Sequence, residues 1–175
     1  MVSLTFTFWM FVILFGLIGM MRGWAKELLV VFSVILALLL NTLLKRYLPM
    51  VNTMPDDEQA LFWIRTIILV VLVFFGYQTV GLPRFSGKVA REKLQDSILG
   101  FVFGLCNGYL VVGTLWFYLH EANYPFPYIE APTSATELGQ AALNLLQTMP
   151  PRVLGEPMIY FAVALAFVFV LVVFI

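Results

Sequence analysis

One apolar run near the N-terminus decides the fold class. Residues 4–44 read LTFTFWMFVILFGLIGMMRGWAKELLVVFSVILALLLNTLL, and charges interrupt this run only within Arg22-Gly23-Trp24-Ala25-Lys26-Glu27. As a single straight α-helix the run would be about 60 Å long, at about 1.5 Å per residue. The hydrocarbon core of a bilayer is only about 30 Å thick. We therefore expect two membrane-spanning helices, with a turn or a strong kink at Gly23, where the backbone is permissive.

The composition of the whole chain agrees with a membrane protein. The chain has 175 residues, of which 62% are hydrophobic and only 11% are charged, with ten basic and ten acidic side chains. Soluble domains carry about a quarter charged residues, and nucleic-acid binders carry a basic excess. The composition therefore excludes an ordinary soluble enzyme, a disordered tail and a nucleic-acid partner, and it indicates that the lipid bilayer is the main partner.

Five stretches of the chain lack charged residues and are long enough to cross a membrane. Barrel strands would alternate apolar and polar residues, and the run from Ile67 to Val73 does not alternate. We therefore predict an all-α, polytopic transmembrane helical bundle that forms a single membrane domain over residues 1–175. About five spans are expected, at approximately residues 4–21, 28–44, 64–82, 97–119 and 158–175. The first of these is expected to be a retained span, because no Lys or Arg precedes it as in a signal peptide.

Short polar segments between the spans carry local signals. The sequence from Ser134 to Glu137 is typical of a capping box and predicts an extracytoplasmic amphipathic helix over residues 135–148, stopped by Pro150-Pro151. Its apolar face would contain Leu138, Ala142, Leu145 and Met149. Residues 84–96 are polar and predict a short interfacial helix. The acidic residues 56–58 are expected to cap the helix that follows them.

The distribution of Lys and Arg predicts the orientation. The first and third connections carry six of these residues in short segments, at Arg22, Lys26, Arg84, Lys88, Arg91 and Lys93. The positive-inside rule places both connections in the cytoplasm, so the N-terminus lies outside, the C-terminus lies inside and the long loop after residue 119 lies outside. Aromatic residues expected at the outer interface are Trp9, Tyr47, Trp63, Trp116, Tyr118 and Tyr160.

The charged pair at the first turn has two interpretations. Arg22 and Lys26 could snorkel to the headgroups while Glu27 suits the positive end of the next helix dipole, which describes a hairpin held at the cytoplasmic interface. Alternatively, Arg22 and Glu27 form a functional buried ion pair inside the bundle.

Glycines recur every four residues at two places. Gly19 and Gly23 end the first span, and Gly100, Gly104 and Gly108 open the fourth. Residues four apart share one helix face, and small residues there let helix backbones approach closely. Two interpretations follow: packing between helices of one chain, or a seam for a homo-oligomer, a membrane-protein partner or a pore lining.

Residues suited to catalysis or metal binding are scarce. Cys106 is the only cysteine and His120 the only histidine, so the sequence predicts no disulfide, no metal site and no cofactor. The five expected spans contain no paired acid, base or nucleophile, which argues against catalysis. They also contain no charged residue deep inside, which argues against ion transport.

Two segments resemble signatures of the CvpA family, the colicin V production proteins. Residues 18–27 (IGMMRGWAKE) resemble that family's IGLxRGFxxE, and residues 96–108 (DSILGFVFGLCNG) resemble DRLLGALFGLLRG. The matching residues are Gly19, Arg22, Gly23, Glu27, Asp96, Gly100, Gly104 and Gly108. The resemblance covers about residues 4–120. This chain has Asn107 where the family often has Arg, and it adds a fifth apolar segment to the usual four.

The resemblance implies a non-enzymatic, multi-pass protein of the bacterial inner membrane. Such proteins are linked to the production or export of a bacteriocin toxin and to envelope maintenance, and no catalytic residues carry over. Two alternatives stay open: a small channel or transporter, which related hairpins around Gly23 and Gly108 would suggest, or an accessory subunit of a larger membrane complex.

Overall fold

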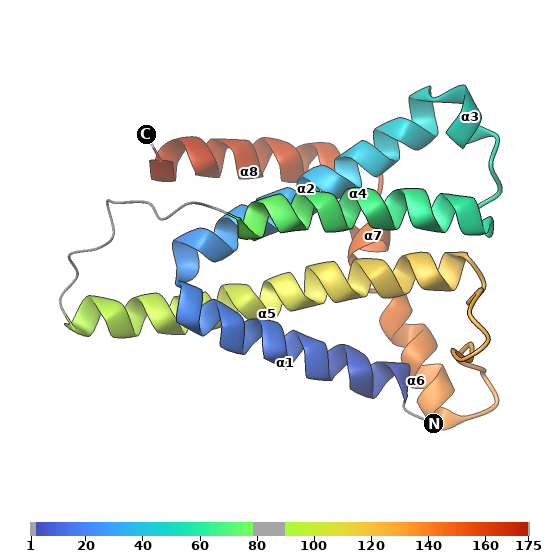
Figure 1. Cartoon of the computed structure of the whole chain (residues 1–175), viewed down its shortest axis with the longest axis horizontal. Helices are drawn as coiled ribbons and strands as arrows, with labels where there is room; N and C mark the ends of the chain where they lie inside the picture. The colour runs from blue at the N-terminus through green and yellow to red at the C-terminus, as the bar shows by residue number, and fades with distance from the viewer. Residues whose placement is uncertain (1–2, 79–89, 175) are drawn as a thin grey trace.

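The computed structural model describes residues 3–78 and 90–174, and these residues form helices joined by turns and loops. The helices are α1 (Leu4–Arg22), α2 (Trp24–Tyr47), α3 (Pro49–Asn52), α4 (Gln59–Tyr77), α5 (Ala90–Glu121), α6 (Glu137–Leu146), α7 (Pro150–Val153) and α8 (Met158–Phe174). Figure 1 shows that α1, α2, α4, α5 and α8 lie along the long axis of the molecule. The all-α helical bundle is therefore confirmed.

Four helices are long and apolar enough to cross a membrane. They are α1, α2, α4 and the segment Lys93–Glu121 of α5, while the apolar part of α8, Met158–Phe169, is shorter. The turn between α1 and α2 and the C-terminal end of α8 lie at one end of the bundle (Figure 1). The N-terminus, α3 and α6 lie at the other end. The protein is therefore an integral membrane protein with at least four candidate spans and a further apolar helix.

The helices pack as two groups that share α5. One core cluster joins α2, α4 and α5, with Val30, Val34 and Leu69 fully buried at its centre. A second cluster joins α1, α5 and α6, with Phe8, Trp116 and Met149 buried. α8 packs against α2. Because α5 contributes to both clusters, it is the central element of the bundle.

Two predicted boundaries change in the structure. The third span, expected at 64–82, begins at Gln59 and ends at Tyr77. The expected span starts more than one turn late, and Arg65, placed at its edge, is 91% buried inside α4, at 9% exposure. The interfacial helix expected over 84–96 is also wrong in its last part, because residues from Ala90 onward are the first turns of α5. The remainder of that segment lies outside the described residues.

The amphipathic helix is shorter than predicted and starts at a different cap. α6 spans Glu137–Leu146, and its N-cap is Thr136, whose hydroxyl accepts a hydrogen bond from the Gly139 amide at 3.1 Å. An N-cap side chain accepts from a backbone amide two or three residues later. The Gly139 amide lies three residues after Thr136 and five after Ser134, so Thr136 is the cap. α6 buries Ala142 and Leu146, while Leu138 is exposed. α6 therefore covers one end of the bundle along a face shifted from the predicted one.

The structure also corrects the expectations for two aromatic residues and for the acidic residues 56–58. Trp116 and Tyr118 are buried, and Trp116 donates a hydrogen bond to the Tyr124 hydroxyl at 3.2 Å, so neither faces lipid. Glu58 is the N-cap of α4 but forms no side-chain cap hydrogen bond. Asp56 instead forms ion pairs with Lys45 and Arg65.

Candidate functional site

The glycines of the two signatures lie in one seam between α1 and α5. A Cβ atom built on Gly104 would meet the Phe15 carbonyl oxygen at 2.5 Å and the Gly19 Cα at 3.1 Å. A Cβ on Gly108 would meet the Val12 Cα at 2.8 Å. Distances below about 3 Å are not seen for real Cβ atoms, so these positions require glycine for the helices to approach this closely. The glycine face of α5 is therefore occupied by α1 of the same chain.

The turn between α1 and α2 depends on Gly23 and Asp96. Gly23 has a φ of 88°, in the region that L side chains rarely adopt, and its amide donates to the Gly19 carbonyl at 3.0 Å. The Asp96 carboxylate accepts a hydrogen bond from the Trp24 amide at 3.3 Å. A Cβ on Gly23 would lie 2.7 Å from Asp96 Oδ2. Asp96 thus satisfies a free amide at the start of α2 and attaches the turn to α5.

Arg22 and Glu27 form an ion pair inside the bundle, in which Glu27 is fully buried and Arg22 is partly buried. Arg22 donates to Glu27 Oε1 at 2.6 Å and to the Tyr77 carbonyl at 3.0 Å, and its guanidinium lies 4.3 Å from the centre of the Tyr77 ring. Glu27 has 0% exposure and accepts a second hydrogen bond, from Asn107 Nδ2 to Oε2 at 2.7 Å. This network joins α1, α2, α4 and α5. Hydrogen bonds and an opposite charge are what allow a carboxylate to be buried.

The eight signature residues therefore occupy one continuous framework at one end and along one side of the bundle. Gly19, Gly100, Gly104 and Gly108 form the seam, Gly23 and Asp96 form the turn, and Arg22 and Glu27 form the buried pair. Asn107, where the family often has Arg, completes the pair by donating to Glu27. In this chain the signature residues contact one another, and none of them lines the polar cavity described below.

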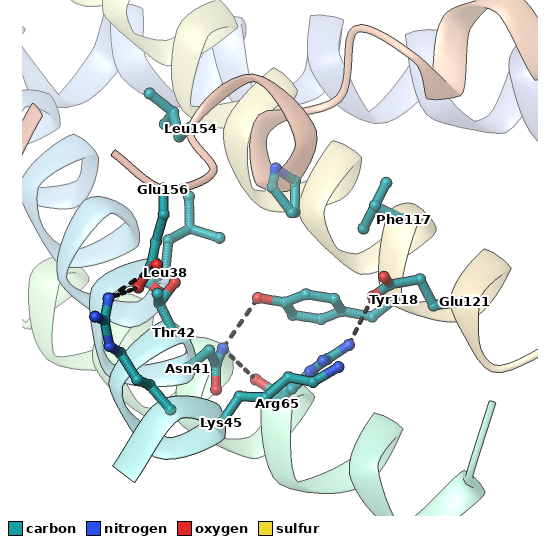
Figure 2. A pocket seen from close by; sticks show the side chains of 12 residues that line it. Leu38, Asn41, Thr42, Lys45, Arg65, Phe117, Tyr118, Glu121, Leu154 and Glu156 are labelled. Carbon is teal, nitrogen blue, oxygen red and sulfur yellow. Dashed lines mark hydrogen bonds and ion pairs between the residues drawn. The ribbon is translucent and has the colours of Figure 1, made fainter. Parts of the chain in front are cut away.

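At the opposite end of the helices, a cavity of about 450 Å³ opens between α2, α4, α5 and the segment around α7. Figure 2 shows its polar side chains. Its walls include the apolar residues Leu38, Phe117 and Leu154 and the polar residues Asn41, Thr42 and Tyr118. Its charged lining residues are Lys45, Arg46, Arg65, Glu121 and Glu156. We refer to this cavity as the polar pocket.

Arg65 organises one wall of the polar pocket. Its guanidinium donates to Glu121 Oε2 at 2.6 Å and to Asp56 Oδ1 at 3.2 Å, as Figure 2 shows for Glu121. It also lies 5.6 Å from the centre of the Tyr118 ring. Lys45 forms a second ion pair with Asp56, and its hydrogen bond lowers the pKa of that carboxyl despite partial burial.

Asn41 and Tyr118 form the buried side of the polar pocket. Asn41 has 8% exposure and donates to the Tyr118 hydroxyl at 3.0 Å, and the two side chains point toward each other in Figure 2. Its Oδ1 atom is buried without a hydrogen-bond partner among the described residues. Asn41, a lining residue of the pocket, therefore keeps one acceptor that no protein group among the described residues uses.

A charged pair lies across the edge of the polar pocket. Arg46, in the last turn of α2, donates to both carboxylate oxygens of Glu156 at 3.0 Å. Glu156 also accepts from the Tyr160 hydroxyl at 2.7 Å, and these hydrogen bonds, that of Tyr160 first, lower the pKa of the Glu156 carboxyl. The pair holds the start of α8 to the end of α2.

Comparison with known families matches this chain to one of them. The sequence model of the colicin V production protein family covers residues 4–136, which is most of the chain. The chain belongs to this family. The match includes every framework residue and continues beyond the expected limit near residue 120, through the loop after α5 to Thr136. No curated protein and no solved structure matches the chain.

The sequence reasoning found the family framework but missed the polar pocket. Asn41 lies on the stripe formed by the buried residues Val34 and Leu38 of α2, and Arg65 lies four residues from the buried Leu61 and Leu69. A polar residue on an apolar helical stripe was the available signal. The sequence showed no charged residue deep inside a span, but it did not reveal that Glu27 and Arg65 are buried within the first two turns of α2 and α4, helices long enough to cross a membrane. Among the described residues, no group of three or more His, Cys, Asp or Glu side chains could hold a metal ion.

Proposed function

We propose that this protein is a non-enzymatic component of the bacterial inner membrane that acts in the production or export of a peptide toxin, or in maintaining the envelope. The observation that carries the proposal is the family match over residues 4–136, because the family is named for colicin V production. In the structure the signature residues contact one another, which supports a role as a framework. The polar pocket is the open, charged region that this framework supports, and we assign the protein's contact with its ligand to it.

The proposal includes an orientation. The positive-inside rule places the Gly23 turn in the cytoplasm, so the polar pocket and α6 would face outward. In a Cys106→Ala background, Tyr128→Cys should react with a membrane-impermeant maleimide added to intact cells. Lys93→Cys should react only after the cells are opened, since Lys93 lies at the other end of α5. The reverse labelling pattern would overturn this orientation.

Release of colicin V tests the functional proposal. A colicin V-producing bacterium that lacks its own family member should release little toxin, and expression of this chain should restore growth inhibition of a sensitive lawn. Detergent sensitivity of the same cells measures envelope integrity. If the chain restores neither toxin release nor detergent resistance, although it is present in the membrane, the proposal is wrong.

A transporter is the second candidate, and one observation favours it. Glu27 is fully buried near one end of the bundle and Arg65 is almost fully buried near the other, and buried charges inside spans often mark ion or proton pathways. Purified protein in liposomes should then carry protons or ions across the membrane, and Glu27→Gln should abolish the flux. Absence of flux across a range of pH and membrane potential would remove this candidate.

A further inference from the structure

The depth, charges, hydrogen-bond acceptors and size of the polar pocket together indicate which kind of ligand it binds. We propose that it binds the headgroup of a zwitterionic aminophospholipid, with the phosphate near Lys45 and Arg46 and the ammonium near Glu121 and Glu156. This assignment names a ligand for the pocket in the proposed function, and lipid retention tests it separately from toxin release.

The depth of the polar pocket matches that of lipid headgroups. Lys45 and Arg46 lie in the last turn of α2, Glu121 is the last residue of α5 and Glu156 precedes α8. All four residues therefore lie at or next to the ends of long apolar helices. Three aromatic side chains near this level are exposed, at Tyr47, Trp63 and Tyr160, while Tyr118 is buried in the pocket wall. Tyr and Trp exposed at helix ends mark the membrane–water interface.

The charges of the polar pocket favour a neutral ligand that carries both signs. The lining bases Lys45, Arg46 and Arg65 are matched by the lining carboxylates Glu121 and Glu156 and by Asp56, which pairs with Lys45 and Arg65 although it does not line the pocket. An anionic headgroup would add an uncompensated negative charge beside three carboxylates. A zwitterionic headgroup adds none, and its phosphate and ammonium meet groups of opposite sign at a similar depth.

Unused acceptors favour an ammonium group over a trimethylammonium group. Asn41 Oδ1 is buried without a partner among the described residues. Glu121 accepts from Arg65 through Oε2. A primary ammonium donates three hydrogen bonds and can satisfy such acceptors, whereas a choline headgroup has no N–H to donate. The apolar walls at Leu38, Phe117 and Leu154 suit the carbon atoms of the headgroup and glycerol.

The size of the polar pocket also fits. Its volume of about 450 Å³ lies within the range of small-molecule sites, which are commonly about 300–1,000 Å³. Thr42 lies on its wall as a half-buried residue whose hydroxyl donates to the Leu38 carbonyl of its own helix at 2.9 Å. A larger side chain at this position would occupy the pocket without removing a charge.

Native mass spectrometry of the full chain in mild detergent tests the proposal. The protein is mixed with equal amounts of phosphatidylethanolamine, phosphatidylcholine and phosphatidylglycerol of matched acyl chains. Phosphatidylethanolamine should be retained about fivefold or more over the other two, a preference that one hydrogen-bonded headgroup can supply. Thr42→Leu should remove this preference. Thr7→Leu is the matched control, since Thr7 is also half-buried and donates to the carbonyl four residues earlier, at 3.2 Å, but does not line the pocket.

Several outcomes would overturn the assignment. Equal retention of the three lipids, a preference for phosphatidylglycerol, or full retention by a folded Thr42→Leu variant would each contradict it. If Thr42→Leu does not assemble, Leu154→Phe narrows the same pocket from another segment and should give the same loss. Soluble phosphoethanolamine that displaces the lipid at equal concentration would show a soluble ligand instead. Failure of lipid retention leaves the toxin-release assay free to succeed.

Discussion

Asn107 donates two hydrogen bonds to Glu27, a residue 80 positions earlier: one to the backbone carbonyl at 2.9 Å and one to the carboxylate at 2.7 Å. Both residues have 0% exposure. The amide of α5 therefore satisfies the carboxylate that Arg22 neutralises, and it connects the turn between α1 and α2 to the central helix.

Asn107→Leu should destabilise the protein by about 2–3 kcal/mol, because hydrogen bonds to charged groups are stronger than neutral ones and the Glu27 carboxylate would lose one while buried. Unfolding in detergent, followed by circular dichroism, measures the change. Asn144→Leu on α6 is the control, since Asn144 is exposed, and it should change stability little. Equal effects of the two substitutions would contradict the role of Asn107.

Glu27→Leu should cost about 3 kcal/mol, because it leaves the partly buried Arg22 guanidinium without its carboxylate. The double variant Arg22→Leu with Glu27→Leu should recover part of this loss, since no unpaired charge remains. A double-mutant cycle on the same unfolding assay gives the coupling free energy. Strictly additive losses would mean that the two side chains do not act as a pair.

Gly104→Ala should cost about 1–3 kcal/mol, because the new methyl group overlaps the Phe15 carbonyl and forces α1 away from α5. Gly155→Ala is the matched control, since its Cβ would lie 3.6 Å from the nearest atom, and it should stay within about 0.5 kcal/mol of wild type. Thermal unfolding of both variants decides the matter. Similar melting temperatures would show that the seam tolerates a side chain.

Asp56 should make stability depend on acid pH. Its pKa is lowered in the folded protein, chiefly by the hydrogen bond from Lys45, so its contribution is present above the ordinary carboxyl pKa of about 4 and is lost as the pH falls below it. The loss should be at most about 1 kcal/mol, since the side chain is 55% exposed and solvent screens the pair. Asp56→Asn should flatten this part of the curve between pH 5 and 3, whereas Asp57→Asn, at an exposed neighbour without an ion pair among the described residues, should not.

The fold could be predicted from the sequence because membranes leave few options. The length of the charge-free runs and the break at Gly23 require helices that turn back at that point. The glycine spacing predicted a close contact and the structure places it within one chain. The sequence could not give the partner helix of each face, because a four-residue repeat describes a surface and not what covers it.

The polar pocket could not be predicted because it arises from distant segments. Arg65 and Glu121 are 56 residues apart, and Arg46 and Glu156 are 110 apart. Counting charges placed Arg65 at the edge of a span, since the count treats every charge as solvated. Burial of Arg65 becomes acceptable only when Glu121, Asp56 and the Tyr118 ring surround it, which is a tertiary property.

Release of colicin V per molecule of membrane-inserted protein tests the central claim most directly, namely that the framework supports a polar pocket where the protein acts. Wild type, Thr42→Leu and Thr7→Leu are expressed at matched membrane abundance in cells that lack the family member. The account predicts that Thr42→Leu releases about tenfold less toxin or more, consistent with losing about 1.4 kcal/mol of binding, while Thr7→Leu releases as much as wild type. Equal release by Thr42→Leu and wild type would contradict the claim.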